Sequence, residues 1–282
     1  MTKGTFFIVF LSLLIGSHTA YSQRYSFAQK AAARAGLTVD DFGSKVCDFK
    51  RDPIARRVLR EYGSVFVAGA DVLVPDKCIF DSRETAERFQ KRAKFVREHI
   101  GGVEITLQPP AMISLLSAIE EAVAIGVRIT PRDGSIAGGR DYDDTIRLWD
   151  SRFYRALDYW LARGKITKEE ADRARLLAAY EQVPLVLNWE SKMIWFSTGF
   201  NRSILSSVAA PGTSQHLSGL AFDVTEYSDS RVRLIMNKHG WYQTVLADEP
   251  HFTYLGGRET QLAGSGLRLL VSNRYRYWVP ID

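Results

Sequence analysis

The feature that most limits the fold of this chain is a change of pattern near residue 103, after which strand-like and helical stretches alternate. Residues 103–107 alternate apolar and polar side chains, as a half-buried strand does. A Pro-Pro pair then opens a helical stretch over 111–125, and residues 127–130 are expected to form a second strand. This mixture is typical of an α+β fold with a small antiparallel sheet and flanking helices.

The middle of this region is predicted to be helical at first and extended later. One helix is expected over 142–163, and a capping box at 167–170 begins another. Two apolar runs, 185–187 and 193–196, are interpreted as strands joined by a turn. After Gly219, strand-like and helical segments alternate again to the end of the chain.

The preceding part, residues 23–100, is predicted to be a small and mainly helical unit. Helical character is clearest over 27–35 and 53–62, the second with a proline at its start. The short apolar run 65–68 is a candidate strand, and Ser82 can cap a charged helix that extends to about Glu98. The role of this unit is open, and a partner-binding module or a lid over a cleft are both compatible with it.

The first 22 residues are interpreted as a secretory signal peptide. Lys3 supplies a positive start, residues 6–15 are an apolar run, and Ala20 and Ser22 are the small residues before a cleavage site. The apolar run is short for a membrane span, which needs about 20 residues. An uncleaved anchor remains the alternative. We expect an exported chain, periplasmic or extracellular, without stable membrane insertion after cleavage.

The composition is that of a folded protein, with 46% hydrophobic and 24% charged residues. An exported chain meets an oxidising environment, so Cys47 and Cys78 are expected to form a disulfide, with two buried free thiols as the alternative. The net charge of +5 is compatible with a polyanionic partner. Basic residues do not interleave with aromatic ones, so no nucleic-acid partner is expected.

Two short blocks carry the chemistry-bearing residues. The first, residues 214–223, places His216 and Asp223 seven positions apart, and the second, residues 248–254, contains His251 with carboxylates beside it. Two histidines and one aspartate form a set of three ligands that leaves a fourth position open, as a catalytic zinc site requires. A nearby carboxylate can take a proton from the attacking water and pass it to the leaving amine.

These blocks resemble those of the zinc D-Ala-D-Ala peptidases, the VanY-like carboxypeptidases and the related L-alanyl-D-glutamate endopeptidases. The resemblance rests on Pro-Gly-Thr-Ser-Gln-His at 211–216 with Gly-Leu-Ala-Phe-Asp at 219–223, and on Asp-Glu-Pro-His-Phe-Thr-Tyr at 248–254. It implies that His216, Asp223 and His251 bind Zn²⁺ on the small sheet. It also implies that Asp248 is the general base, with the neighbouring Glu249 as the alternative.

A third block, Gly-Arg-Asp-Tyr-Asp-Asp-Thr at 139–145, resembles the family's arginine-containing segment. By resemblance, Arg140 steadies the scissile carbonyl oxygen as it gains negative charge, a role that suits an always-charged donor. Arg202 is the competing arginine. Ser214, Arg202 and Trp241 are candidate substrate-binding residues, and packing in the core is the alternative for Trp241.

The resemblance covers roughly residues 103–260 and departs from the family's pattern at several positions. Gln215 stands where a Glu is common, Thr145 where a Gln is usual, and the Trp before the last His is missing. We therefore expect a zinc peptidase-like domain over 103–282, with an insertion around 155–205. The expected function is hydrolysis of an amide in peptidoglycan stem peptides, most simply as a D-Ala-D-Ala carboxypeptidase. The alternative is a non-catalytic wall-binding or scaffolding protein that keeps the fold.

Overall fold

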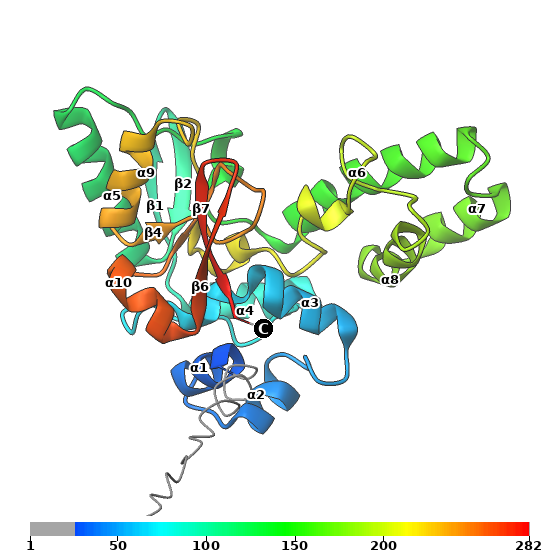
Figure 1. Cartoon of the computed structure of the whole chain (residues 1–282), viewed down its shortest axis with the longest axis horizontal. Helices are drawn as coiled ribbons and strands as arrows, with labels where there is room; N and C mark the ends of the chain where they lie inside the picture. The colour runs from blue at the N-terminus through cyan, green and yellow to red at the C-terminus, as the bar shows by residue number, and fades with distance from the viewer. Residues whose placement is uncertain (1–25, 282) are drawn as a thin grey trace, which may run out of the picture.

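The computed structural model describes residues 26–281. The signal peptide expected over residues 1–22 lies outside this range. Figure 1 shows two parts: a main body that contains the sheets, and an arm of three helices that extends from one side of it. Helices and small antiparallel sheets occur together, so the expected α+β class is confirmed.

The N-terminal region is helical, as predicted. Its elements are α1 (Ser26–Arg34), α2 (Val39–Lys45), α3 (Pro53–Tyr62), the 3₁₀ helix η1 (Gly63–Val67) and α4 (Arg83–Arg92). Local signals explain their starts. Asp52 accepts a hydrogen bond from the backbone N–H of Ile54 at the start of α3, and Ser82 forms a capping box with Thr85 at the start of α4.

Two predictions in this region are wrong. Residues 65–68 are not a strand, because the chain continues from α3 directly into η1. The charged helix that Ser82 caps ends at Arg92 rather than near Glu98, and Val96–Ile100 forms strand β1 instead. Lys94, between the two elements, has a positive φ of 53°, which turns the chain out of the helix.

Strand β1 pairs antiparallel with β2 (Val103–Leu107) through a turn at Gly101 and Gly102. The expected boundary between residues 100 and 103 therefore lies inside a β-hairpin. The main hydrophobic core also extends across it, since Phe42 and Phe66 belong to the same buried cluster as Leu107. The disulfide between Cys47 and Cys78 is confirmed and joins the end of α2 to the segment before α4.

The central sheet is small and antiparallel, as expected. It contains β3 (Ala221–Asp223), β5 (His251–Tyr254) and β4 (Trp241–Tyr242), in that spatial order. Helices α5 (Pro109–Ala124) and α9 (Ser230–Lys238) pack against each other beside it (Figure 1). Residues 127–130 do not form the predicted strand. The adjacent Pro131 forms an isolated β-bridge with Val224, but residues 127–130 themselves join no strand.

The arm consists of α6 (Tyr142–Ala162), α7 (Lys168–Leu176) and α8 (Ala179–Glu190), and it has a hydrophobic cluster of its own. The capping box at Thr167 is confirmed. The two strands predicted at 185–187 and 193–196 are wrong: the first run lies in α8, and the second is irregular. Short apolar runs do not distinguish a strand from a buried helix segment. Here Val183, Val186 and Trp189 recur at helical spacing and are buried.

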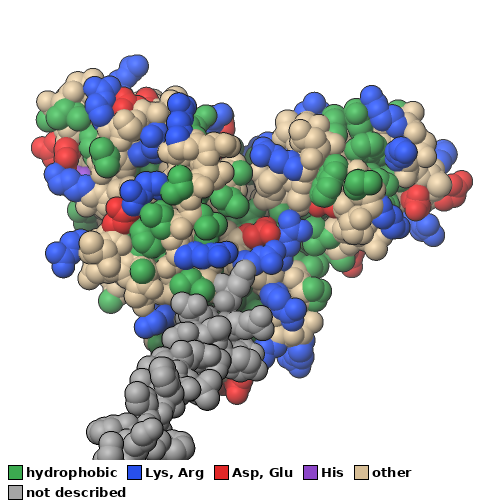
Figure 2. Space-filling model, viewed as in Figure 1, with side chains coloured by type: hydrophobic (Ala, Val, Ile, Leu, Met, Phe, Trp, Pro, Cys, Tyr) green, Lys and Arg blue, Asp and Glu red, His purple; other side chains and the backbone are tan. Residues whose placement is uncertain are grey.

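The C-terminal part closes the main body. Helix α10 (Glu259–Leu262) and η5 (Ala263–Ser265) lead into a hairpin of β6 (Leu267–Ser272) and β7 (Tyr275–Pro280). Strand β7 contacts α3 and η1, so the C-terminal hairpin packs against the N-terminal helical region. Over residues 26–281, no helix is long and apolar enough to cross a membrane. Figure 2 shows Lys and Arg side chains spread over both the body and the arm.

Candidate metal centre

Three short elements bring the predicted ligands together. His216 lies in the 3₁₀ turn η4 (Gln215–Ser218), Asp223 ends β3, and His251 begins β5. Asp223 and His251 are directly paired across the antiparallel ladder, which places their side chains on one face of the sheet. Gly219 makes the turn between η4 and β3 with a φ of 65°, and a Cβ there would lie 2.5 Å from the ring of Phe95.

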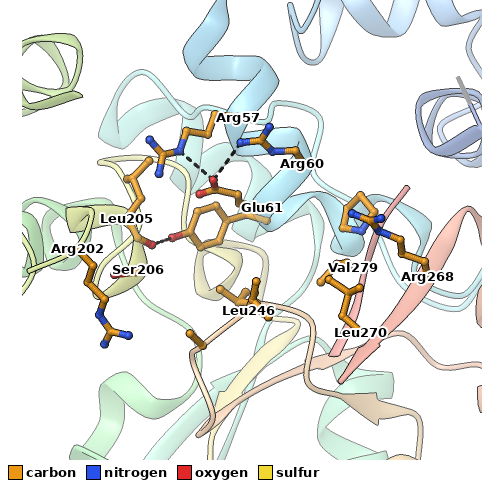
Figure 3. Close-up of a pocket in the computed structure, with 14 residues that line it drawn as sticks. Arg57, Arg60, Glu61, Arg202, Leu205, Ser206, Leu246, Arg268, Leu270 and Val279 are labelled. Atoms are coloured by element: carbon orange, nitrogen blue, oxygen red, sulfur yellow. Dashed lines mark hydrogen bonds and ion pairs between the residues drawn. The ribbon is translucent and has the colours of Figure 1, made fainter. Parts of the chain in front are cut away.

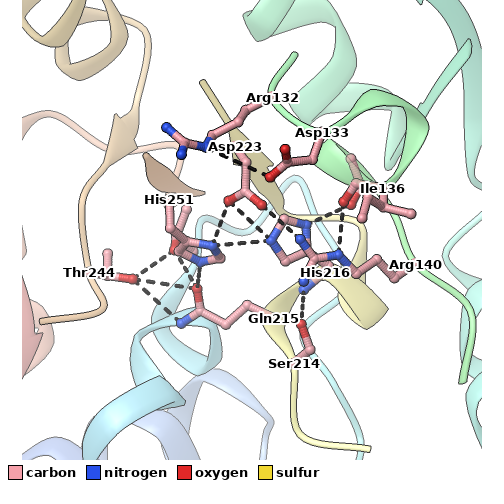
Figure 4. A network of polar contacts seen from close by, with 12 residues as sticks. Arg132, Asp133, Ile136, Arg140, Ser214, Gln215, His216, Asp223, Thr244 and His251 are labelled. Carbon is pink, nitrogen blue, oxygen red and sulfur yellow. Dashed lines mark hydrogen bonds and ion pairs between the residues drawn. The ribbon is translucent and has the colours of Figure 1, made fainter. Parts of the chain in front are cut away.

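The donor atoms of these residues converge on one point. The distance from Nε2 of His216 to Oδ1 of Asp223 is 3.3 Å, and that from Nδ1 of His251 to the same oxygen is 3.1 Å. The two imidazole nitrogens are also 3.1 Å apart. All three ligand atoms lie within 4.8 Å of one another. Figure 4 shows the three side chains pointing toward one another. The three predicted ligands therefore form one group.

Hydrogen bonds on the outer side of each ring determine which nitrogen carries the proton. Nδ1 of His216 lies 2.6 Å from the carbonyl oxygen of Gly138, and Nε2 of His251 lies 2.8 Å from Oε1 of Gln215. Both partners are acceptors, so each outer nitrogen must donate. The inner nitrogens, Nε2 of His216 and Nδ1 of His251, then present lone pairs toward each other and toward Asp223.

Three facing acceptors without a proton between them repel one another, and a cation removes that repulsion. Imidazole and carboxylate ligands suit zinc and other first-row transition metals. The residues therefore fit a metal ion, and the buried His-Asp-His group can hold one.

Arg140 contacts this group through Asp223, on the side away from the two histidines. Its Nη2 donates to Oδ2 of Asp223 at 2.7 Å, and its Nε donates to the carbonyl oxygen of Ile136 at 2.8 Å. Burial opposes the charge on Asp223, but a proton on His216 or His251 and the guanidinium of Arg140 favour it, and together they hold the pKa of Asp223 well below its usual range in the metal-free chain. Asp223 is therefore ionised. Its Oδ2 accepts from Arg140, and its Oδ1 faces the two imidazole rings.

His216 is kept neutral by its surroundings. Burial lowers the pKa of His216 to about 4, and the positive charge of Arg140 acts in the same direction. A neutral imidazole is the form that binds a metal ion, so at neutral pH no proton has to leave the ring before a metal binds.

His216, Asp223 and His251 lie in the wall of a cavity of about 230 Å³. Asp248 lines the same cavity, whereas Glu249 does not, which places only one of the two candidate bases beside the ligands. The carboxylate of Asp248 accepts no hydrogen bond from the described part of the chain. Burial raises the pKa of Asp248 to about 6, and the charge of Asp223 also raises it.

The three predicted substrate-binding residues have different locations. Ser214 lines the cavity and also caps η4, where its Oγ accepts from the backbone N–H of His216. Arg202 is exposed and lines a neighbouring groove rather than the metal cavity. Trp241 is fully buried in the core, between Phe222 and Tyr254, and lines neither space. A substrate contact by Trp241 is therefore wrong, because its side chain is enclosed by the sheet.

Sequence reasoning treated Gln215 only as a departure from a pattern, and the structure gives it a direct role. Its Oε1 accepts from His251, and its Nε2 donates to the carbonyl oxygen of Tyr62 at 2.7 Å and to Oγ of Ser64 at 2.9 Å. Gln215 thus connects the candidate metal ligand His251 to η1, which is distant in the sequence. Its position immediately before His216 is the one signal that could have identified it.

Arg152 was also not identified from the sequence. It reaches the same cavity from α6 of the arm, and its buried Nε has no hydrogen-bond partner among residues 26–281.

Comparison with the models of known protein families and with curated proteins finds no match for this chain.

Proposed function

We propose that the chain is an exported zinc metallopeptidase that hydrolyses an amide bond in peptidoglycan stem peptides. The bond between two D-Ala residues is the first candidate, and that between L-Ala and D-Glu is the second. One observation carries the proposal: the lone pairs of His216, Asp223 and His251 converge in the wall of a cavity that also holds the carboxylate of Asp248.

His216, Asp223 and His251 would hold the zinc ion. When bound, zinc polarises a carbonyl group and makes water a nucleophile at neutral pH. Gly138 and Gln215 keep the two imidazole rings in the binding tautomer through the outer hydrogen bonds. These contacts prepare the ligand set before any substrate enters.

Asp248 is assigned as the general base. It takes a proton from the attacking water and gives it to the leaving amine, so that hydroxyl adds to the carbonyl carbon as the C–N bond breaks. A pKa near 6 leaves the carboxylate ionised at neutral pH, yet basic enough to hold a proton during the reaction. Glu249 lies outside the cavity lining and is not assigned a role in catalysis.

Arg140 is assigned two roles. Its Nη2 orients Asp223, while its Nη1 makes no hydrogen bond among the described residues and can donate to the substrate oxygen as that oxygen becomes negative. Export is supported by the disulfide, which is typical of oxidising compartments, and by the signal-like start of the sequence. The net charge of +5 favours residence near an anionic wall.

The deciding experiment measures metal content and hydrolysis on the same preparations. We expect one zinc per purified chain and none in His216→Ala. Stem peptides with defined D- and L-centres are then incubated with the parent, with Asp248→Asn and with Glu249→Gln as the matched control. Hydrolysis lost in Asp248→Asn and kept in Glu249→Gln supports the proposal.

Two results would overturn it. A parent chain that neither contains zinc nor takes it up on reconstitution has no peptidase centre. A zinc-loaded parent that cleaves no stem peptide but binds isolated cell wall is instead the non-catalytic scaffold.

A further inference from the structure

A second and larger groove lies beside the metal cavity. It has a volume of about 440 Å³ and is formed by α3, the segments 202–206 and 245–247, and the hairpin of β6 and β7. Figure 3 shows Arg202 and Arg268 on opposite sides of this groove, with Leu246 between them. None of the roles assigned to the metal centre uses this space.

The charges around the groove are unbalanced. Four arginines line it, and Glu61 is the one carboxylate in the lining. Glu61 is already engaged, since its Oε1 lies 2.9 Å from Nε of Arg57 and 3.5 Å from an Nη of Arg60. Within residues 26–281, Arg202 and Arg268 make no ion pair, and both are exposed. Two guanidinium groups are therefore free to bind an anion.

The groove and the metal cavity are neighbours with a common wall. Tyr62, Leu205, Ser206 and Val245 line both spaces. The segment that lines the groove at 245–247 continues directly into Asp248, which lines the metal cavity. An extended ligand with one bond in the metal cavity can therefore continue into the groove.

The floor of the groove indicates which kind of anion fits. Leu246, Leu270, Val279 and Pro280 give it an apolar surface between the arginines. A peptide with acidic side chains can bury apolar atoms there and present carboxylates to guanidinium groups, which bind them in a bidentate way. A phosphate polymer offers charge but little apolar surface.

We propose that this groove binds the carboxylate-bearing part of an acidic peptide, with Arg202 and Arg268 as the anion-binding residues. The inference rests on the proposed function in one respect only, namely that the same peptide carries the bond to be cleaved. It gives Arg202 a different role from that of an oxyanion donor, because Arg202 selects the substrate at a distance from the metal ligands.

The test measures binding separately from hydrolysis. Two acetylated pentapeptides are compared by isothermal titration calorimetry, one with two Glu residues and one with Gln in their place. The proteins are the full mature chain, the double variant Arg202→Gln/Arg268→Gln, and Arg128→Gln as the matched control. Arg128 is also exposed and unpaired among the described residues, and it lines neither space. Each protein is also measured with His216→Ala, which removes a metal ligand.

We expect the Glu peptide to bind about tenfold more tightly than the Gln peptide, as one charge-assisted hydrogen bond would provide. The preference should fall to about twofold or less in the double variant and persist in Arg128→Gln and with His216→Ala. A parent chain without preference overturns the inference, as does a preference that the double variant keeps. Tighter binding of a polyphosphate than of the Glu peptide also overturns it, in favour of a phosphate polymer. A preference that persists in a zinc-loaded parent that cleaves no stem peptide would refute the proposed function alone.

Discussion

Two buried glutamines show how differently the metal centre and the arm are built. Gln215 accepts a hydrogen bond from the candidate metal ligand His251, and Gln182 accepts one from Nε1 of Trp149 in the arm. Both side chains are at most 3% exposed. The first connects polar groups on η4, β5 and η1, whereas the second satisfies one indole within an apolar helical cluster.

Similar burial of a polar side chain serves different purposes in the two regions. In the metal centre, polar contacts aim lone pairs at one point, and small changes of position alter metal affinity. In the arm, apolar packing supplies most of the stability. The hydrogen bonds of its buried polar groups mainly prevent the cost of leaving those groups unpaired. Substitutions in the arm should therefore change stability without changing metal affinity, whereas substitutions of the groups that orient the ligands should change metal affinity.

The largest effect is expected in the arm. Phe153 is fully buried and stacks on Phe196 with ring centroids 6.0 Å apart. Phe153→Ala should lower the free energy of unfolding by about 4 kcal/mol, because the cavity cannot be refilled by neighbouring aromatic rings. Urea unfolding measures this loss, and competition with a chelator measures zinc affinity. A weakening of zinc binding beyond about threefold would show that the two regions are coupled.

The next effect is expected beside the ligands. Gln215→Ala should weaken zinc binding by about 10- to 100-fold, because the imidazole of His251 loses the acceptor that orients it. Gln182→Ala is the matched control in the arm and should leave the dissociation constant for zinc unchanged while lowering stability. Equal zinc affinities in the two variants would contradict the assigned role of Gln215.

The stability of the metal-free chain should depend on pH through Asp248. The pKa of Asp248 is about 6 in the folded chain, raised by burial above its ordinary value of 3.8. The folded state therefore holds the proton more tightly than the unfolded state, and the metal-free chain loses stability as the pH rises from about 4 to about 6. Asp248→Asn should stabilise the metal-free chain by about 1–2 kcal/mol at pH 8 and by little at pH 4.

Unfolding in urea with EDTA present, repeated across this pH range, measures the effect. Glu190→Gln is the counterpart in the arm, where burial also raises the pKa of the carboxyl group. We expect Glu190→Gln to raise the free energy of unfolding at pH 8, as Asp248→Asn does. If Asp248→Asn and the parent had the same free energy of unfolding at every pH, the charge of Asp248 would not destabilise the folded chain.

The smallest effects concern helix caps. Thr167 accepts from the backbone N–H of Glu170 at the start of α7, and Thr167→Ala should cost about 1 kcal/mol of stability. Ser214 caps η4 with a longer contact of 3.4 Å to the backbone N of His216, so Ser214→Ala should cost less, about 0.5 kcal/mol. Thermal unfolding of both variants tests this order, and the reverse order would contradict it.

Local interactions explain which elements were predictable. The capping boxes at Ser82 and Thr167 join residues three positions apart, so the sequence shows both partners together. The apolar run 185–187 was misread as a strand because its burial depends on α6, which packs against it. Its surroundings, and not its composition, make it part of a helix.

The candidate metal ligands, their order along the chain and the cysteine pair were predictable from the sequence, because residue type limits which atoms can bind a metal or form a disulfide. Only the folded chain shows that Arg140 contacts Asp223 across 83 positions and that Gln215 orients His251 across 36. It also enclosed Trp241 in the core and placed Arg202 in a separate groove. These contacts join distant segments, and only the packing of the sheet against its neighbours brings such segments within hydrogen-bonding distance.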